Sequence, residues 1–505
     1  MRRSVRILTV VATTGALAAG SAVAANSAPQ HGGHGTEIRN VIYLLGDGMG
    51  RTHVTAARER FYGATGKLNM ERLPNYGAVA TYAVEKDSDQ PSLVTDSASS
   101  ATAWSSGVKT YNAAIGVDAY ENKVATLMEQ AHQAGFATGN VSTAEVTDAT
   151  PAAEFSHALL RGCQGPVYSD ASCLPKKADG TYENKPADQT LITPIAEQIA
   201  RNGTADVILG GGLARFEPDD QKALQAQGYQ VLGSFGDPAL PAQTAATQKV
   251  ATKDDLANVK RGKVVGLFNR GNLTIENAKA KLPADAPQKQ EPTLAEMTKK
   301  SLSLLDGRSK KGFLLQVEGA QIDKRSHAND AAQALDEIKA FDDAVKTAVD
   351  FARKDGHTLV VVTADHECAG FNIIEKGTFT NAEAAAPPAN TDAGNPANNS
   401  TPSRSSSANV KDPARSSGIV NGAGANDPKN FGPATFRTPD DPADVKDGTP
   451  EASLWLSYLS GNHTGADVPI YAYGPGGKRF AVSQNNVDLY GKLYRQLFGT
   501  APRTN

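Results

Sequence analysis

Unbroken apolar runs alternate with helix-like stretches along this sequence, and that alternation restricts the fold more than any other feature. The runs include NVIYLLGDGMG, GKVVGLFN, GFLLQVEGA and HTLVVVTADH, and each gives way to Gly or a polar residue. Continuous apolar strands are typical of parallel sheets, because helices bury both faces. One intervening stretch has apolar residues at helical spacing and stops at Gly356. We therefore expect an α/β fold with a doubly wound, mostly parallel central sheet flanked by helices.

Composition and charge place the 505-residue chain among ordinary globular proteins, with 40% hydrophobic and 21% charged residues. Its length would suffice for several average domains, but large α/β enzymes commonly form one. We expect a single domain over residues 36–505. The net charge is −3, and no dense basic run is present. We therefore expect no nucleic-acid binding module and no attraction to anionic membranes.

The N-terminus has the three parts of a secretory signal peptide. Arg2, Arg3 and Arg6 precede an apolar, Ala-rich run, and SAVAAN then supplies the small residues of a cleavage site. The apolar run is too short for a membrane-spanning helix, and no later segment predicts one. We expect residues 1–25 to be removed and the protein to be exported to the periplasm or the extracellular space.

The three cysteines fit an oxidising compartment. Cys163 and Cys173 flank the short polar segment QGPVYSDAS, and we expect them to form a disulfide. Closing so short a loop stabilises a fold by about 2–3 kcal/mol. Cys368 is left over. It is either a small buried hydrophobe or a weak partner near a metal, and the sequence leaves both interpretations open.

Residues 376–449 differ from the rest of the chain. They include PPANTDAGNPANNSTPSRSSSANVKD, which has too few apolar residues to bury a core. We expect a flexible Pro/Asn/Ser-rich surface insertion. Such a segment is either a tolerated loop or a functional lid.

The candidate functional residues are the polar side chains that follow the apolar runs, because open parallel sheets bind ligands beyond the carboxyl ends of their strands. Asp323 and His327 are four residues apart, so one helical turn would place both on one face. Each candidate alone could be a turn, surface or loop residue. Together, His with carboxylate suits zinc, and carboxylate with hydroxyl suits Mg²⁺. The candidates are Asp47, Asp148, Thr150, Glu318, Asp323, His327, Asp365, His366 and His463.

A candidate nucleophile lies in LVTDSASSATAWSSGVKTYN. Ser97 follows Asp96 at the expected start of a helix, where the positive backbone potential favours an alkoxide. A nearby metal ion would lower the pKa of Ser97 further. Asp and Ser are also common N-caps, so spacing alone leaves a capping role open. Other enzyme classes fit poorly: HECAG lacks the second His of the zincin motif, and P-loop and G-x-S-x-G motifs are absent.

Six motifs resemble those of the bacterial alkaline phosphatases, and they occur in the order of that family. They are LLGDGMG, TDSASSATAWSSGVKTYN, GNVSTAEVTDATPAAEFSHALLRGC, VEGAQIDKRSH, TADH and GNHTG. The resemblance covers about residues 38–375 and 450–500 and leaves out the insertion. It implies a doubly wound α/β phosphomonoesterase with two Zn²⁺ and one Mg²⁺ per chain. Small-molecule phosphate monoesters would be its substrates, phosphoserine its intermediate, and a homodimer its assembly.

The resemblance also implies a role for each matching position. Ser97 matches the nucleophile, and Arg161 matches the arginine that clamps the phosphoryl group. Asp148 and Lys324 match positions behind the ligands, where this pairing is similar to that of magnesium-type members. Cys368 stands where some members carry His. The implied metal ligands are Asp323, His327 and His463 for the first zinc, Asp47, Asp365 and His366 for the second, and Asp47, Thr150 and Glu318 for magnesium.

Overall fold

The computed structural model describes residues 39–237, 247–376, 434–449, 451–458 and 461–502. The expected signal peptide lies outside these residues, as does most of the expected insertion. Among the described helices, none has the length and apolarity that a membrane span requires.

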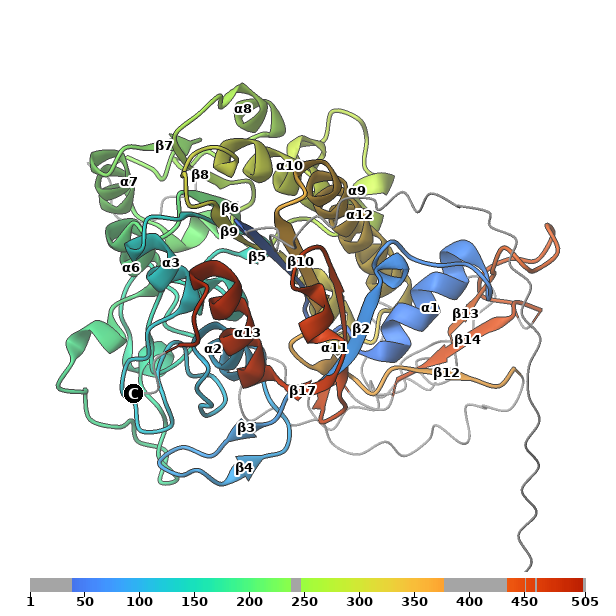
Figure 1. The fold of residues 1–505 in the computed structure, drawn as a ribbon, viewed down its shortest axis with the longest axis horizontal. Helices are drawn as coiled ribbons and strands as arrows, with labels where there is room; N and C mark the ends of the chain where they lie inside the picture. Colours follow the sequence, from blue (N-terminus) through green and yellow to red (C-terminus); the bar gives the residue numbers. More distant parts are fainter. Residues whose placement is uncertain (1–38, 238–246, 377–433, 450, 459–460, 503–505) are drawn as a thin grey trace, which may run out of the picture. The chain divides into compact units, whose positions relative to one another are not determined.

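A ten-stranded sheet organises the described part of the chain (Figure 1). All of its strand pairs are parallel except the two that β16 makes, with β10 and β2. In spatial order the strands are β17 (Ser483–Asn485), β2 (Asn75–Ala80), β16 (Val468–Tyr473), β10 (Thr358–Thr363), β1 (Asn40–Gly46), β9 (Phe313–Gly319), β5 (Ala137–Glu145), β6 (Val207–Gly211), β8 (Lys263–Leu267) and β7 (Tyr229–Leu232). The predicted mostly parallel sheet is confirmed; the reversed direction of β16 was not predicted.

The central strands explain the unbroken apolar runs. Every residue of β10, β1 and β9 is buried. In register, Leu44 of β1 pairs with Val362 on one side and with Val317 on the other. Because helices cover both faces, successive side chains pointing in opposite directions all enter apolar surroundings, and no alternation of polar residues is needed.

Helices pack on the sheet in two groups (Figure 1). Helices α1 (Arg51–Tyr62), α10 (Leu294–Leu305) and α12 (Ala331–Asp355) form one contacting group, and α2 (Ser97–Ser106), α3 (Leu127–Gln133) and α13 (Asn486–Phe498) form the other. Helix α12 ends at Gly356, which takes the left-handed conformation (φ 73°) that favours glycine. The other α-helices are α4 (Ala149–Ala152), α5 (Asp170–Cys173), α6 (Ile195–Asn202), α7 (Pro218–Ala226), α8 (Lys253–Asn258), α9 (Glu276–Lys281) and α11 (Gln321–His327).

Three small sheets lie outside the main one. Their strands are β3 (Ala83–Val84) with β4 (Pro91–Ser92), β11 (Glu367–Cys368) with β15 (His463–Thr464), and β12 (Asn372–Ile374) with β14 (Leu454–Ser457) and β13 (Ala434–Phe436). In the second of these, Cys368 pairs with His463. That pairing joins two segments that are distant in sequence.

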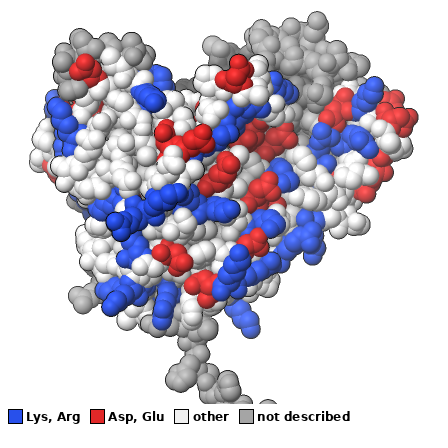
Figure 2. All heavy atoms as spheres, turned by 90° about the horizontal axis from the view of Figure 1, so that it is seen from above, with Lys and Arg blue, Asp and Glu red and all other residues white. Residues whose placement is uncertain are grey.

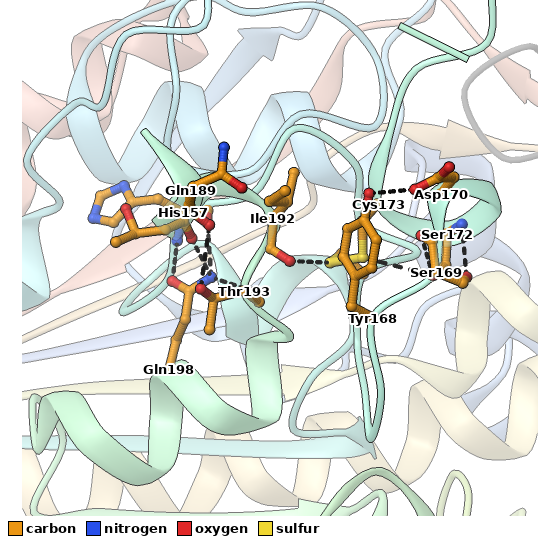
Figure 3. The surroundings of a disulfide bond; sticks show 12 residues. His157, Tyr168, Ser169, Asp170, Ser172, Cys173, Gln189, Ile192, Thr193 and Gln198 are labelled. Carbon is orange, nitrogen blue, oxygen red and sulfur yellow. Dashed lines mark hydrogen bonds between the residues drawn. A yellow bond between two sulfur atoms is a disulfide. The ribbon is translucent and has the colours of Figure 1, made fainter. Parts of the chain in front are cut away.

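The expected disulfide joins Cys163 to Cys173, while Cys368 is free and buried. Figure 3 shows the bond beside the short helix α5, whose first turn is capped by Ser169. The cysteine loop is therefore tied at its base and carries a helical turn that its polar composition did not predict.

Charged side chains of both signs are interspersed on the face drawn in Figure 2. Because neighbouring charges of opposite sign largely cancel, the described residues of that face produce no extended field of one sign.

Candidate active site

Four neighbouring strands deliver predicted site residues to one edge of the sheet. Asp47 follows β1, Glu318 lies near the end of β9, Asp148 follows β5 and Asp365 follows β10. These strands are adjacent in the order β10-β1-β9-β5 and run parallel, so their carboxyl ends meet. The candidates gather at the edge where an open α/β sheet is expected to bind its ligand.

Ser97 is the first residue of helix α2, and its side chain does not cap that helix. Asp96 is the N-cap, accepting a hydrogen bond from the Ser99 backbone N–H at 2.9 Å. The Ser97 hydroxyl is buried and lies 3.1 Å from His366 Nε2 and 3.4 Å from Asp47 Oδ1. The capping role therefore belongs to Asp96, and Ser97 Oγ points toward candidate metal ligands.

Asp47, Asp365 and His366 form a buried cluster, here called the inner group. His366 Nε2 lies 3.1 Å from Asp365 Oδ2 and 3.6 Å from Asp47 Oδ1. One oxygen or nitrogen from each residue lies within 4.8 Å of the others. Such convergence of carboxylates and an imidazole is typical of a divalent metal site.

Asp323, His327 and His463 lie together with the Sγ of Cys368 in a second cluster, and the first three residues are here called the outer group. The Nδ1 atoms of His327 and His463 lie 2.5 Å from Gly461 O and 2.9 Å from Thr95 O. Carbonyl oxygens only accept hydrogen bonds, so both Nδ1 atoms carry the proton. When both rings are neutral, their Nε2 atoms, 3.0 Å apart, present lone pairs toward each other. They also lie 3.2 and 3.5 Å from Asp323, an arrangement that suits a cation between them.

The buried carboxylates of the site lie close together, and their pKa values indicate that bound cations would stabilise them. Burial, followed by repulsion from Asp365, raises the pKa of Asp47 well above its ordinary value, and burial raises that of Glu318 to about 7. Burial would also raise the pKa of Asp323, but protonated His327 and His463 together outweigh burial and hold that pKa well below its usual range. A bound cation would relieve the repulsion among carboxylates packed this closely.

Several buried oxygens lack hydrogen-bond partners within the described residues. They include Thr150 Oγ1, Asp323 Oδ1 and Asp365 Oδ2. Thr150 lies on α4, which packs against β5 and β9, the strand that carries Glu318. Buried polar atoms are rarely left unsatisfied, so these oxygens fit the coordination of metal ions. The residues present are consistent with the metals that the sequence implied.

Arg161 is held in place by two carboxylates. Its guanidinium donates to Asp96 Oδ2 at 3.1 Å and to Asp148 Oδ1 at 3.0 Å, and Lys324 Nζ donates to Asp148 Oδ2 at 2.7 Å. Burial would raise the pKa of Asp148, but Lys324 and Arg161 hold it well below its usual range. The arrangement fixes the direction in which the arginine fork points.

Sequence reasoning missed two contacts that support the site. Asp96 was considered only as a helix cap, and in the structure it also accepts a hydrogen bond that orients Arg161. Ser142 of β5 donates a short hydrogen bond to Glu318. Nothing in the sequence distinguished Ser142, because this contact joins two strands through their pairing.

Cys368 lies beside the outer group, and this position is compatible both with a small buried hydrophobe and with a weak partner near a metal. Its side chain is fully buried, and its Sγ is 3.8 Å from the Asp323 carbonyl oxygen and within 4.8 Å of the donor atoms of the outer group. Burial raises the pKa of this thiol well above its ordinary value. Neighbouring Glu367 instead accepts hydrogen bonds from the backbone N–H groups of Gly370 and Phe371.

Residues 38–496 match the family model for alkaline phosphatase. The chain belongs to the alkaline phosphatase family. It is 41% identical over 357 residues to an alkaline phosphatase of Escherichia fergusonii, covering 65% of this chain and 70% of the relative. It is 37% identical over 366 residues to a streptomycin-6-phosphate phosphatase of Streptomyces griseus, covering 68% and 77%. A crystal structure of a cold-active alkaline phosphatase from Shewanella sp. superposes with a TM-score of 0.60 at 27% identity, covering 92% of this chain and all of that one.

Membership of the alkaline phosphatase family makes the chain a metal-binding phosphomonoesterase. The predicted family, fold and enzyme class are confirmed. The roles of individual residues, the identity and number of the metal ions, export and the homodimer stay predictions.

Proposed function

We propose that this exported phosphomonoesterase hydrolyses small phosphate monoesters to an alcohol and inorganic phosphate through a phosphoserine at Ser97. The observation that carries the proposal is the position of Ser97 Oγ, buried and 3.1 Å from His366 Nε2 at the mouth of the inner group. A hydroxyl in such a setting is poised to lose its proton and attack phosphorus.

The metal assignment follows the family resemblance, and the donor sets are compatible with it. The outer group is assigned to the first zinc, the inner group to the second, and Asp47, Thr150 and Glu318 to one magnesium. When bound, the two zinc ions would supply Lewis-acid stabilisation to the attacking and leaving oxygens of an in-line displacement. The pairing of Lys324 with Asp148 is similar to that of magnesium-type members of the family, and this similarity supports magnesium at the third position.

The chain's own residues then perform two displacements. Ser97 Oγ attacks phosphorus, the bond from phosphorus to the substrate oxygen breaks, and the alcohol departs with a proton. Arg161 holds phosphoryl oxygens with its planar fork while Asp96 and Asp148 keep it oriented. Water then attacks phosphoserine from the vacated side and the bond from phosphorus to Ser97 Oγ breaks. One proton of the water returns to Ser97 Oγ, and hydrogen phosphate leaves.

The substitution Ser97→Ala tests this mechanism. It should lower turnover of a phosphate monoester by several orders of magnitude, because the covalent route is lost. Radiolabelled phosphate, trapped in acid, should label Ser97 in the wild type and leave the variant unlabelled. Near-wild-type turnover in a folded Ser97→Ala protein with full metal content would refute the proposal.

The main candidate is an enzyme that accepts many phosphate monoesters. The second candidate is an enzyme that serves one phosphorylated metabolite, and the similarity to streptomycin-6-phosphate phosphatase favours it. Phosphodiesters and sulfate esters are further candidates for a related site. Three predicted cations favour a monoester, because it presents one more charged oxygen than a diester. Rates on a panel of monoesters, together with one methyl diester, would separate these candidates. Tight phosphate binding without turnover would instead indicate a binding protein.

Localisation, domain organisation and assembly complete the proposal. We infer removal of residues 1–25, a single domain over residues 36–505 with the insertion at 376–449, and a homodimer. Cleavage near Ala24 or Ala25 would make the N-terminal sequence of the secreted protein begin at about Asn26. Light scattering on the purified enzyme should give twice the mass of the processed chain.

A further inference from the structure

A cavity of about 1000 Å³ adjoins the candidate active site. Arg161, Lys324 and His327 line its inner end and belong to the site described above. Its outer wall includes Lys176 and Tyr182, from the segment that follows the disulfide-tied loop drawn in Figure 3. A substrate whose phosphoryl group contacts Arg161 would place its leaving group in this cavity.

The cavity wall is rich in cations, and most of their carboxylate partners are not among the residues that line it. Lys86 pairs with Glu121 and Glu183 at 3.1 and 3.0 Å, and Arg215 pairs with Glu145 at 2.9 Å. None of these three carboxylates is among the lining residues. The charged lining residues are Lys86, Arg161, Lys176, Arg215, Lys324 and Arg325, with Asp148 as the one carboxylate.

Arg325 and Lys176 differ from the other cations of the wall. Neither forms an ion pair within the described residues, and the buried Arg325 Nε has no hydrogen-bond partner there. The Glu337 carboxyl is close enough to interact electrostatically with Arg325. Burial raises the pKa of Glu337 to about 8, so this carboxyl is largely neutral near pH 7. The wall therefore offers two cations whose charge is not matched by a neighbouring carboxylate.

We propose that this cavity binds leaving groups that carry a second anionic group, a carboxylate or a phosphate, through Arg325 and Lys176. The proposal rests on the proposed function, because the phosphoryl group must contact Arg161 for the leaving group to enter the cavity. Tyr111, Leu160 and Leu174 line the same cavity and suit the carbon skeleton between the two anions. A cationic leaving group would be repelled by the same wall.

Two matched substrate pairs test the preference. Gluconate 6-phosphate and glucitol 6-phosphate are both open-chain and differ in a carboxylate. Glucosamine 6-phosphate and glucose 6-phosphate are both rings and differ in an amine. Two partly exposed ion pairs predict a kcat/KM for gluconate 6-phosphate about ten-fold above that for glucitol 6-phosphate at low salt. Glucosamine 6-phosphate should fall below glucose 6-phosphate, and both differences should shrink as ionic strength rises.

Charge-removing variants identify the residues responsible. Arg325→Gln and Lys176→Gln should each lower the gluconate-to-glucitol ratio about three- to five-fold, mainly through KM, since the contact is remote from the breaking bond. Lys177→Gln is the matched control: Lys177 is exposed, adjacent to Lys176 and outside the cavity lining. Lys176 is the decisive position, because Arg325 shares a helix with Asp323 and His327.

The outcomes separate this inference from the proposed function. Hydrolysis of all four esters with equal kcat/KM would overturn the inference and leave the phosphomonoesterase intact. A fall in the ratio for Lys177→Gln equal to that for Lys176→Gln would also overturn it, because the effect would then be a general surface field. Failure of the metal-loaded wild type to hydrolyse any ester would overturn the proposed function itself.

Discussion

The inner and outer groups both consist of Asp and His, but different secondary-structure elements carry them. Asp47 and Asp365 of the inner group follow two central strands of the main sheet, and every member of that group is buried. The outer group comes from the seven-residue helix α11 and the two-residue strand β15, and its two histidines are partly exposed. The rings of His366 and His463 stack at 3.6 Å, so the two groups adjoin.

This difference predicts unequal metal binding. Ligands at the ends of strands inside a large parallel sheet are held by pairing on both sides, so little ordering is required when the ion binds. Ligands on short elements lose more conformational freedom on binding. We expect the outer ion to exchange faster and the inner ion to be retained longest during chelation.

The largest expected effect is that of Asp47→Ala. Asp47 is predicted to contact both the second zinc and the magnesium, and it lies 3.4 Å from Ser97 Oγ. Removing it should lower kcat by on the order of a thousand-fold or more. Elemental analysis should show the loss of more than one ion per chain. A variant that keeps both its full metal content and its turnover would contradict the shared role.

A smaller loss is expected for His463→Ala, with Asp365→Ala as its counterpart in the inner group. Either change removes one ligand and should lower turnover at limiting zinc. Excess zinc should restore more activity to the outer-group variant, because the remaining ligands are more accessible there. Equal rescue of both variants, measured by zinc titration, would remove the distinction between the two groups.

The metal-free protein should show a pH effect that the loaded protein lacks. Burial raises the pKa of Glu318 from 4.5 to about 7 and also raises that of Asp47 well above its ordinary value. A carboxyl whose pKa is raised on folding stabilises the protein below its unfolded pKa, and that contribution is lost as pH rises through the folded value. Stability without metal should therefore fall between about pH 4.5 and 7. Thermal unfolding with and without metal measures this, and Glu318→Gln should reduce the fall.

Much of this architecture could be predicted because it depends on short sequence patterns. Unbroken apolar runs indicated strands buried on both faces, and the polar residues at their ends indicated the site. Contacts between distant segments could not be predicted this way. The pairing of Cys368 with His463 and the hydrogen bond from Arg161 to Asp96 depend on how segments meet in space. The antiparallel β16 was missed for a similar reason, since an apolar run does not encode its direction.

Cys368 gives the smallest expected effect and the finest test of the outer group. If the thiol is only a small buried hydrophobe, Cys368→Ser and Cys368→Ala should leave zinc affinity within about two-fold, with a modest loss of stability from the polar hydroxyl in Ser alone. If Sγ instead contacts the outer ion, cobalt-substituted wild type should show a thiolate-to-cobalt absorption band that both variants lack. Because the buried Sγ already contacts the Asp323 carbonyl oxygen at 3.8 Å, we expect no such band and nearly unchanged affinity. A strong band would show that Cys368 is a fourth ligand of the outer ion. The two groups would then differ in their number of ligands as well as in the elements that carry them.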